Sequence, residues 1–242
     1  LSGKAPIMKE TYHWYLPMGN EEGWLKEWIA NGILDGKQHH DPKTWKKQVV
    51  GQCLSWIDGK LGDRAISRDL DWGVKVPLEN TDGKVLYVWL DAPIGYISAT
   101  KQWAKNNNKD WKPYWQDEET SLIHFIGKDN IVFHSIIWPS MLMGYGSGGV
   151  VGDRRGDLQL PYDIVSSEFL TMEGKKFSSS RGAAILVKDF LARYQADSLR
   201  YFLTAAGPET QDTDFTWSEF ARRNNDELVA NWGNLVNRTL TS

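Results

Sequence analysis

The stretch "SLIHFIGKDNIVFHSIIWPSMLMG", residues 121–144, begins as a nearly continuous apolar run and continues with the spacing of a helix. Two other runs, "KVLYVWLDAP" (84–93) and "YDIVSSEFLTM" (162–172), have the same character, and a segment with helical spacing follows each of them. Apolar strands that alternate with helices are typical of a parallel sheet covered on both faces. The sequence therefore predicts an α/β fold with up to three parallel strands.

Composition limits the classes of protein that need to be considered. The 242 residues carry a formal net charge of −3, so no global basic field attracts the chain to nucleic acid. The single cysteine, Cys53, lies in an apolar run and cannot form a disulfide framework within the chain, which suits a buried structural thiol in a reducing cytoplasm. No apolar stretch approaches the roughly 20 residues that span a bilayer, so we expect no membrane partner.

Helices are expected on both sides of the strand-and-helix region. The segment 20–32 places its apolar residues at helical spacing and ends at a glycine, and 41–59 does the same with Asp41 as the expected N-cap. From about residue 216 the pattern predicts one long amphipathic helix. Its arginines, Arg222 and Arg223 among them, are more typical of a solvated face than of an RNA-binding face.

Three segments at the expected carboxyl ends of the strands carry unusual side chains. "WLDAPIGY" (89–96) supplies aromatic rings, "FIGKDN" (125–130) offers a glycine and a carboxylate suited to a ribose, and "GKKFSSSRG" (174–182) is rich in donors for phosphate. Each alone is more often an ordinary turn or surface loop. Ligands of open α/β sheets bind outside the carboxyl ends of the strands, so together the three predict a pocket with an aromatic half and a nucleotide half.

Longer strings in this region resemble one family. "YVWLDAPIGYISATK" (87–101), "HFIGKDNIVFHSIIWPSMLMG" (124–144) and "LRYFLTAAGPETQDTDFTWSEFARRNND" (199–226) resemble the class I methionyl-tRNA synthetases in order and spacing. "KFSSSRG" (176–182) stands where that family has its KMSKS signature, and the resemblance covers almost the whole chain.

The resemblance implies a domain organisation. We expect the second half of a Rossmann-type parallel sheet, with a helical connective segment before it and helical stem-contact and anticodon-domain segments after it. The expected limits are 1–70 for the end of the connective insertion, 71–172 for the second half of the catalytic domain, 173–215 for the signature loop and stem-contact helices, and 216–242 for the first helix of the anticodon-binding domain.

The resemblance also implies a role for individual residues. Arg68 matches an arginine that organises the active site, Gly127 and Asp129 match ATP ribose contacts, and Asn234 and Arg238 match positions that face the tRNA anticodon. The residues that match the methionine pocket are Trp89, Ala92, Pro93, Tyr96, Asn130, Phe133, His134 and Trp138. Those that match the catalytic, phosphate-binding loop are Lys176, Ser178, Ser179 and Ser180, with Ser179 in place of the family's second lysine.

The activity implied is that of a methionine–tRNA ligase, which uses ATP with Mg²⁺ and acts on methionine and tRNA(Met). The family's HIGH tetrapeptide and zinc-binding CxxC knuckle are absent here, and in the family they lie upstream. We therefore expect a fragment that is inactive alone, whose partner is the N-terminal half of the enzyme, with any zinc confined to that half. Two alternatives stay open: a class I synthetase for leucine, isoleucine or valine, and a synthetase-derived, non-catalytic tRNA-binding module.

Overall fold

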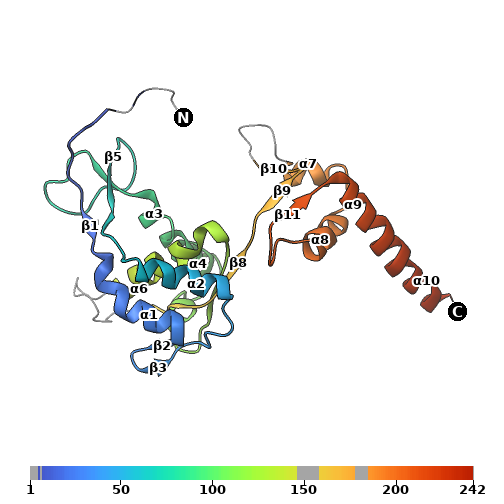
Figure 1. The fold of residues 1–242 in the computed structure, drawn as a ribbon, viewed down its shortest axis with the longest axis horizontal. Helices are drawn as coiled ribbons and strands as arrows, with labels where there is room; N and C mark the ends of the chain where they lie inside the picture. The colour runs from blue at the N-terminus through green and yellow to red at the C-terminus, as the bar shows by residue number, and fades with distance from the viewer. Residues whose placement is uncertain (1–4, 6, 146–157, 178–184, 242) are drawn as a thin grey trace. The chain divides into compact units, whose positions relative to one another are not determined.

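The computed structural model describes residues 5, 7–145, 158–177 and 185–241 (Figure 1). The chain divides into two compact units, one formed by residues 1–124 and 130–165 and the other by 125–129 and 166–242. In the described part of the chain, no helix is long and apolar enough to cross a membrane.

The first unit opens with two helices and short two-stranded pairings. Leu25 and Trp28 of the first helix and Val49 and Cys53 of the second are buried, and the first helix ends at Gly32, whose φ of +68° favours glycine. The elements are β1 (Tyr15–Leu16) paired with β4 (Arg64–Ala65), a 3₁₀ turn (Met18–Glu21), α1 (Glu22–Asn31), β2 (Ile33–Leu34) paired with β3 (Lys37–Gln38), and α2 (Lys47–Asp58).

Asp41 does not cap the second helix as expected. Its carboxylate accepts a hydrogen bond from the backbone N–H of Lys43 at 2.9 Å and forms a local turn, and α2 begins six residues later, at Lys47. Aspartate stabilises turns by the same side-chain-to-backbone bond that it uses at an N-cap, which explains the error. Cys53 is fully buried, and burial raises the pKa of its thiol to about 11, so the prediction of a structural thiol is confirmed.

The prediction of a parallel strand over residues 84–93 is wrong. Within 84–93 only β6 (Lys84–Leu86) is a strand, and it pairs antiparallel with β5 (Ser67–Asp69). The chain then turns into α3 (Val88–Asp91) and α4 (Ile94–Asn106). Periodicity alone does not separate a short buried strand from the start of a helix in so apolar a run.

The deciding stretch 121–144 folds as predicted, with a strand that leads into a helix. The strand is β7 (Leu122–Gly127), which pairs with β8 (Pro161–Ser167), and the unit boundary falls within both strands. The remaining elements here are α5 (Pro113–Gln116), a 3₁₀ turn (Lys128–Asn130), a π-helical segment (Phe133–Ile137) and α6 (Trp138–Gly144).

The second unit contains a three-stranded sheet and the long C-terminal helix. The central strand β9 pairs parallel with β11 and antiparallel with β10. The core of this unit consists of Phe190, Phe202, Phe215 and Phe220. The elements are β9 (Leu170–Met172), β10 (Lys175–Lys176), α7 (Val187–Leu191), α8 (Ala196–Ala205), β11 (Thr213–Phe215), and a continuous helix made of α9 (Trp217–Arg223), a π-helical segment (Asn224–Gly233) and α10 (Asn234–Leu240).

The amphipathic C-terminal helix predicted from about residue 216 is confirmed. It begins where the hydroxyl of Thr216 accepts a hydrogen bond from the N–H of Glu219 at 3.1 Å, which satisfies one of the free donors of the first turn. Phe220 is the buried anchor of its apolar side.

Candidate functional site

A tyrosine and a histidine from different helices form the polar centre of the aromatic region in the first unit. The hydroxyl of Tyr96, on α4, lies 2.9 Å from Nε2 of His134, on the π-helical segment. Nδ1 of His134 lies 3.1 Å from the backbone oxygen of Asn130, one helical turn earlier. The carbonyl can only accept, so Nδ1 carries the proton, Nε2 accepts, and the Tyr96 hydroxyl donates to it.

This hydrogen bonding matches a neutral imidazole. Burial lowers the pKa of His134, and the hydrogen bond to Asn130 opposes that shift only in part. His134 is therefore uncharged near neutral pH, and the centre of the aromatic region carries no net charge. Such a surface suits a neutral, polarizable side chain and penalises a charged one.

Aromatic rings surround the Tyr96–His134 pair. Trp89 and Phe133 meet edge to face with ring centroids 5.8 Å apart, and Phe133 lies 5.4 Å from the ring of His134. Tyr96 lies 6.3 Å from Trp138, which is buried, whereas Trp89 and Tyr96 are 49% and 43% exposed. The rings thus form one aromatic cluster, in which Trp138 is buried and Trp89 and Tyr96 are exposed.

The structure brings most of the predicted methionine-pocket residues to this one place. Trp89, Tyr96, Phe133, His134 and Trp138 are linked by ring contacts, and Asn130 joins them through its carbonyl. Ala92, which is exposed, and Pro93, which is buried, form the turn between α3 and α4 and so lie between Trp89 and Tyr96 in the chain.

Gly127 and Asp129, the predicted ribose contacts, lie at the end of β7 and belong to the second unit. A Cβ at position 127 would lie only 2.8 Å from a carboxylate oxygen of Asp129, so the carboxylate folds over the bare strand end and would have to move aside for a larger residue. Asp129 is exposed there. A carboxylate presented over a bare backbone is the arrangement that accepts hydrogen bonds from ribose hydroxyls.

The segment that carries Lys176 is a tight hairpin between β9 and β10. Glu173 and Gly174 connect the strands with φ angles of +48° and +71°, the backbone of a type I′ turn. Both carboxylate oxygens of Asp214, on the neighbouring β11, accept from the N–H of Gly174 at 3.0 and 2.9 Å. The hairpin is therefore fastened to the sheet, and Lys176 leaves it from a defined backbone position. Ser178, Ser179 and Ser180 lie outside the described residues.

Arg68 is held by backbone oxygens of β4 and of its own strand, β5. Its guanidinium donates to the backbone oxygens of Ala65 and Ser67 at 3.2 and 2.7 Å and lies 3.9 Å from the ring centre of Tyr87. The planar group is thus fixed by stacking and hydrogen bonds. These contacts connect β5 with Tyr87, which follows β6 and precedes α3.

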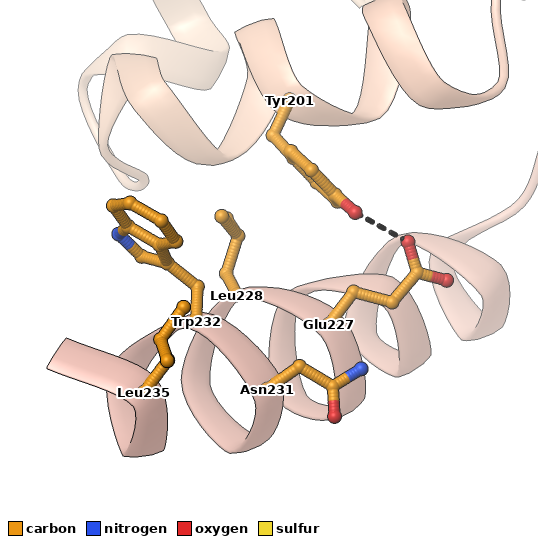
Figure 2. A pocket seen from close by; sticks show the side chains of 6 residues that line it. All are labelled: Tyr201, Glu227, Leu228, Asn231, Trp232 and Leu235. Atoms are coloured by element: carbon orange, nitrogen blue, oxygen red, sulfur yellow. Dashed lines mark hydrogen bonds between the residues drawn. The ribbon is translucent and has the colours of Figure 1, made fainter. Parts of the chain in front are cut away.

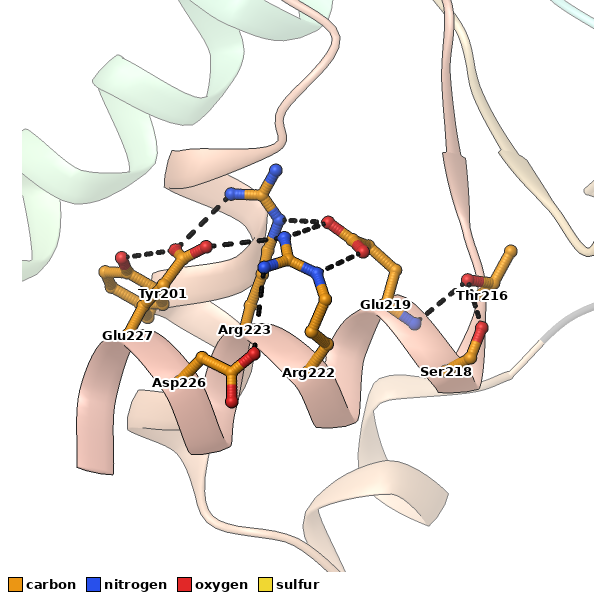
Figure 3. A network of polar contacts seen from close by, with 8 residues as sticks. All are labelled: Tyr201, Thr216, Ser218, Glu219, Arg222, Arg223, Asp226 and Glu227. Atoms are coloured by element: carbon orange, nitrogen blue, oxygen red, sulfur yellow. Dashed lines mark hydrogen bonds and ion pairs between the residues drawn. The ribbon is translucent and has the colours of Figure 1, made fainter. Parts of the chain in front are cut away.

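Two arginines of the C-terminal helix, Arg222 and Arg223, form ion pairs with neighbouring carboxylates (Figure 3). Arg222 donates to both oxygens of Glu219 at 2.8 and 2.7 Å, and Arg223 donates to Glu219 at 2.8 Å. Asp226 and Glu227 add longer contacts, so two cations face three anions. This finding agrees with the interpretation of the segment as a solvated face.

Farther along the same helix, Asn234 and Arg238 are exposed on α10 and four residues apart, so they share one face. A pocket of about 590 Å³ lies between α8 and this helix (Figure 2). Tyr201 closes one end by donating to Glu227 at 2.7 Å, and the exposed Trp232 stands at the other end.

Comparison with known proteins agrees with this geometry. The family profile described as "tRNA synthetases class I (M)" matches residues 1–240. The chain belongs to this family. The methionine–tRNA ligases of Chloroflexus aggregans and Christiangramia forsetii are 53% and 52% identical to it over 253 and 242 residues. The structure of Mycobacterium tuberculosis methionyl-tRNA synthetase in complex with methionyl-adenylate matches with a TM-score of 0.72 and 27% sequence identity.

The match covers almost all of this synthetase chain but a minor part of its relatives. It includes 100% of the chain and 40% of the Chloroflexus protein, and 99% of the chain and 32% of the Christiangramia protein. For the Mycobacterium tuberculosis structure the shares are 95% and 40%. The resemblance to the class I synthetase fold predicted from the sequence is confirmed, and the chain spans about a third to two fifths of the curated relatives.

Two features of the synthetase chain were missed by the sequence reasoning. His124, on β7, is buried with its ring 5.4 Å from Tyr96 and 5.3 Å from His134, and its Nε2 has no hydrogen-bond partner among the described residues. Lys128 forms ion pairs with Glu168 at 2.8 Å and Asp212 at 2.7 Å. The position of His124 inside an apolar strand was a usable sequence signal. The ion pairs of Lys128 join residues that are 40 and 84 positions apart, and no sequence signal indicated them.

Proposed function

We propose that the protein containing this chain is a methionine–tRNA ligase. It activates methionine with ATP to methionyl-adenylate and transfers the methionyl group to tRNA(Met). The observation that carries the proposal is the buried, neutral His134 hydrogen-bonded to Tyr96 within an aromatic surround. The relatives named methionine–tRNA ligase at above 50% identity support it.

The specificity for methionine is explained by the chemistry of this surround. A thioether is polarizable and gains from contact with ring edges, and Trp89, Phe133 and Trp138 supply such rings. The neutral Tyr96–His134 pair leaves no charge to attract a lysine or glutamate side chain. A branched aliphatic side chain would bury apolar surface against the rings but would make no sulfur–aromatic contact. Leucine, isoleucine and valine are therefore the poorer substrates.

Activation consists of attack by the methionine carboxylate on the α-phosphorus of ATP, with pyrophosphate leaving. This step needs no protein nucleophile, and catalysis comes from positioning and from stabilisation of phosphate charge. Gly127 and Asp129 hold the ribose, and Lys176 with Ser178, Ser179 and Ser180 contacts the phosphates. Arg68 keeps the β5–β6 region in place.

Mg²⁺ enters this scheme with the ATP. In residues 5, 7–145, 158–177 and 185–241, no cluster of three or more His, Cys, Asp or Glu side chains is arranged to hold a metal ion. Bound with ATP, Mg²⁺ would neutralise negative charge on the phosphates. We assign the reaction to the cytoplasm, where the buried free thiol of Cys53 stays reduced.

For the tRNA, Asn234 and Arg238 are the proposed anticodon contacts, because they are exposed on one face of α10 and outside the network of Figure 3. The domain limits at residues 70, 172 and 215 belong to the same proposal.

The test is methionine-dependent ATP–pyrophosphate exchange by the full-length gene product, with leucine, isoleucine and valine measured in parallel. We expect exchange with methionine and at least about 10²-fold lower kcat/KM with the other three, the scale of discrimination that a pocket contact provides. Comparable exchange with a branched amino acid would reassign the substrate. Exchange with none of the four, together with retained tRNA binding, would support the non-catalytic module instead.

A further inference from the structure

Lys128 stands between the two proposed ribose contacts, yet its charge is already engaged. Its Nζ lies 2.7 Å from the carboxylate of Asp212 and 2.8 Å from that of Glu168. The hydrogen bonds that Lys128 donates to Asp212 and, to a lesser extent, to Glu168 raise its pKa, so it is cationic throughout the physiological range. Because two carboxylates already compensate its positive charge, Lys128 is poorly suited to bind a phosphate.

Phe169 links this ion triad to the signature hairpin. Its backbone N–H donates at 2.8 Å to the same oxygen of Asp212 that receives Lys128, and its ring faces the ammonium of Lys128 with 4.5 Å to the ring centre. The ammonium of Lys176 lies over the same ring at 5.7 Å. Both distances are within the roughly 6 Å range of cation–π attraction.

The two lysines on this ring differ in one respect. Lys128 is paired with two carboxylates, whereas Lys176 forms no ion pair within the described part of the chain. The backbone of Lys176 is fixed, because the turn at Gly174 is held by Asp214 and the turn residue Glu173 accepts from the N–H of Trp217 at 3.0 Å. The freedom that remains is in the Lys176 side chain, and the ring of Phe169 is what it contacts.

We infer that Phe169 is a positioning residue for Lys176. The ring holds the Lys176 ammonium, which pairs with no carboxylate of the described residues, near Lys128 of the loop 127–129, because both lysines lie over the same ring. The side chain is then already oriented toward the ATP phosphates when they bind. The triad of Lys128, Glu168 and Asp212 keeps Phe169 there, and its net charge of −1 offsets the repulsion between the two lysines. This inference rests on the proposed function, since it gives Lys176 a phosphate to contact.

A double-mutant cycle in the full-length enzyme tests whether Phe169 acts through Lys176. Phe169→Leu keeps an apolar side chain but removes the ring, and we expect about fivefold lower kcat in ATP–pyrophosphate exchange with the KM for methionine unchanged. Phe169→Tyr keeps the ring and should restore most of the rate. In a Lys176→Ala background, Phe169→Leu should cause no further loss. A full additional fivefold loss in that background would overturn the inference.

Phe125→Leu is the matched control. Phe125 is a 79% exposed phenylalanine of the same unit, and the ammonium groups of Lys128 and Lys176 lie over the ring of Phe169 and not over its ring. A loss of kcat in this variant equal to that in Phe169→Leu would mean that the effect is general to aromatic surface residues, against the inference.

A measurement without turnover separates this inference from the proposed function. In protein labelled at lysine, the ε-methylene protons of Lys128 and Lys176 should be shifted upfield by the ring of Phe169, and Phe169→Leu should abolish both shifts while Phe169→Tyr keeps them. Unshifted ε-methylene resonances of Lys176 in the wild type would refute its contact with the ring of Phe169, even if exchange activity is robust. If wild-type exchange is absent but both shifts are present, the proposed function fails and the contact itself stands.

Discussion

The hydroxyl of Tyr96 donates to Nε2 of His134 across 2.9 Å, and this bond fixes the protonation pattern of the aromatic site. Nδ1 of His134 is committed to the carbonyl of Asn130, so the imidazole holds one proton and its second nitrogen is an acceptor. Removal of the Tyr96 hydroxyl would leave that buried acceptor unsatisfied.

Tyr96→Phe in the full-length enzyme should therefore raise the KM for methionine about tenfold, because an unpaired buried acceptor costs about 1–3 kcal/mol. The KM for ATP should stay within a factor of two. Tyr114→Phe serves as the control, since Tyr114 is an exposed tyrosine that contacts Trp103 instead. Parallel increases in both KM values for Tyr96→Phe would show that the hydroxyl is not specific to the amino acid site.

Trp89 should report the binding of methionine. Its ring is 49% exposed and lies edge to face on Phe133, so a ligand seated there changes the polarity around the indole. Methionine should alter the tryptophan emission of the full-length protein, and Trp89→Phe should remove most of the change. Trp72→Phe, at a tryptophan that is 77% exposed elsewhere, should leave the change intact. An undiminished signal in Trp89→Phe would exclude this position from the site.

Lys176→Ala should lower the rate of pyrophosphate exchange by about 10²–10³, the usual loss when one donor to a developing negative charge is removed. The dissociation constant for methionine should hardly move. Lys175→Ala is the natural comparison, because it removes the same charge from the adjacent residue of β10. Equal losses in the two variants would indicate a general electrostatic effect of the hairpin.

Parts of the fold and of the candidate site were predictable from the sequence, for physical reasons. The strand and helix of 121–144 were predictable because the apolar run and the helical spacing follow one another without a break. The run at 84–93 was predicted wrongly because its apolar residues serve a short antiparallel strand and a helix start equally well. The Tyr96–His134 bond joins residues 38 positions apart, and spacing alone carries no information on such a contact.

The stability of the first unit should depend on pH through its buried histidines, of which His40 and His124 have the most strongly lowered pKa values. Burial lowers the pKa of His40 to about 4, with further lowering by the nearby His39, and burial lowers the pKa of His124 to about 4. Unfolded histidine has a pKa near 6.5, so the unfolded chain takes up protons first as the pH falls. The free energy of unfolding is therefore unaffected above pH 6.5 and decreases as the pH falls from 6.5 toward 4.

His40→Gln should remove one of these two contributions. Each histidine accounts for about 2 kcal/mol between pH 7 and pH 5, since one pKa unit corresponds to 1.36 kcal/mol. Urea unfolding of the purified chain at the two pH values measures the difference. An identical loss of stability in wild type and variant between pH 7 and pH 5 would contradict the assignment of His40 as buried and neutral.

Arg238→Ala should weaken aminoacylation at the tRNA step alone. The residue is exposed on α10 with Asn234, so its loss should lower kcat/KM for tRNA about tenfold and leave pyrophosphate exchange unchanged. Arg200→Ala removes another exposed arginine, 2.9 Å from Asp197 on α8, and should affect neither reaction. A loss of exchange in Arg238→Ala would signal damage to the fold instead of a lost contact.

The most direct test of the central claim is to identify the amino acid that the full-length protein attaches to tRNA. The protein is incubated with all twenty amino acids, Mg-ATP and total tRNA, and the esterified amino acid and its tRNA are determined by mass spectrometry. The account predicts methionine on tRNA(Met), greatly reduced in Tyr96→Phe at limiting methionine. A different amino acid on the tRNA would contradict the account. The absence of any esterified amino acid, when ATP and tRNA are shown to be intact, would also contradict it.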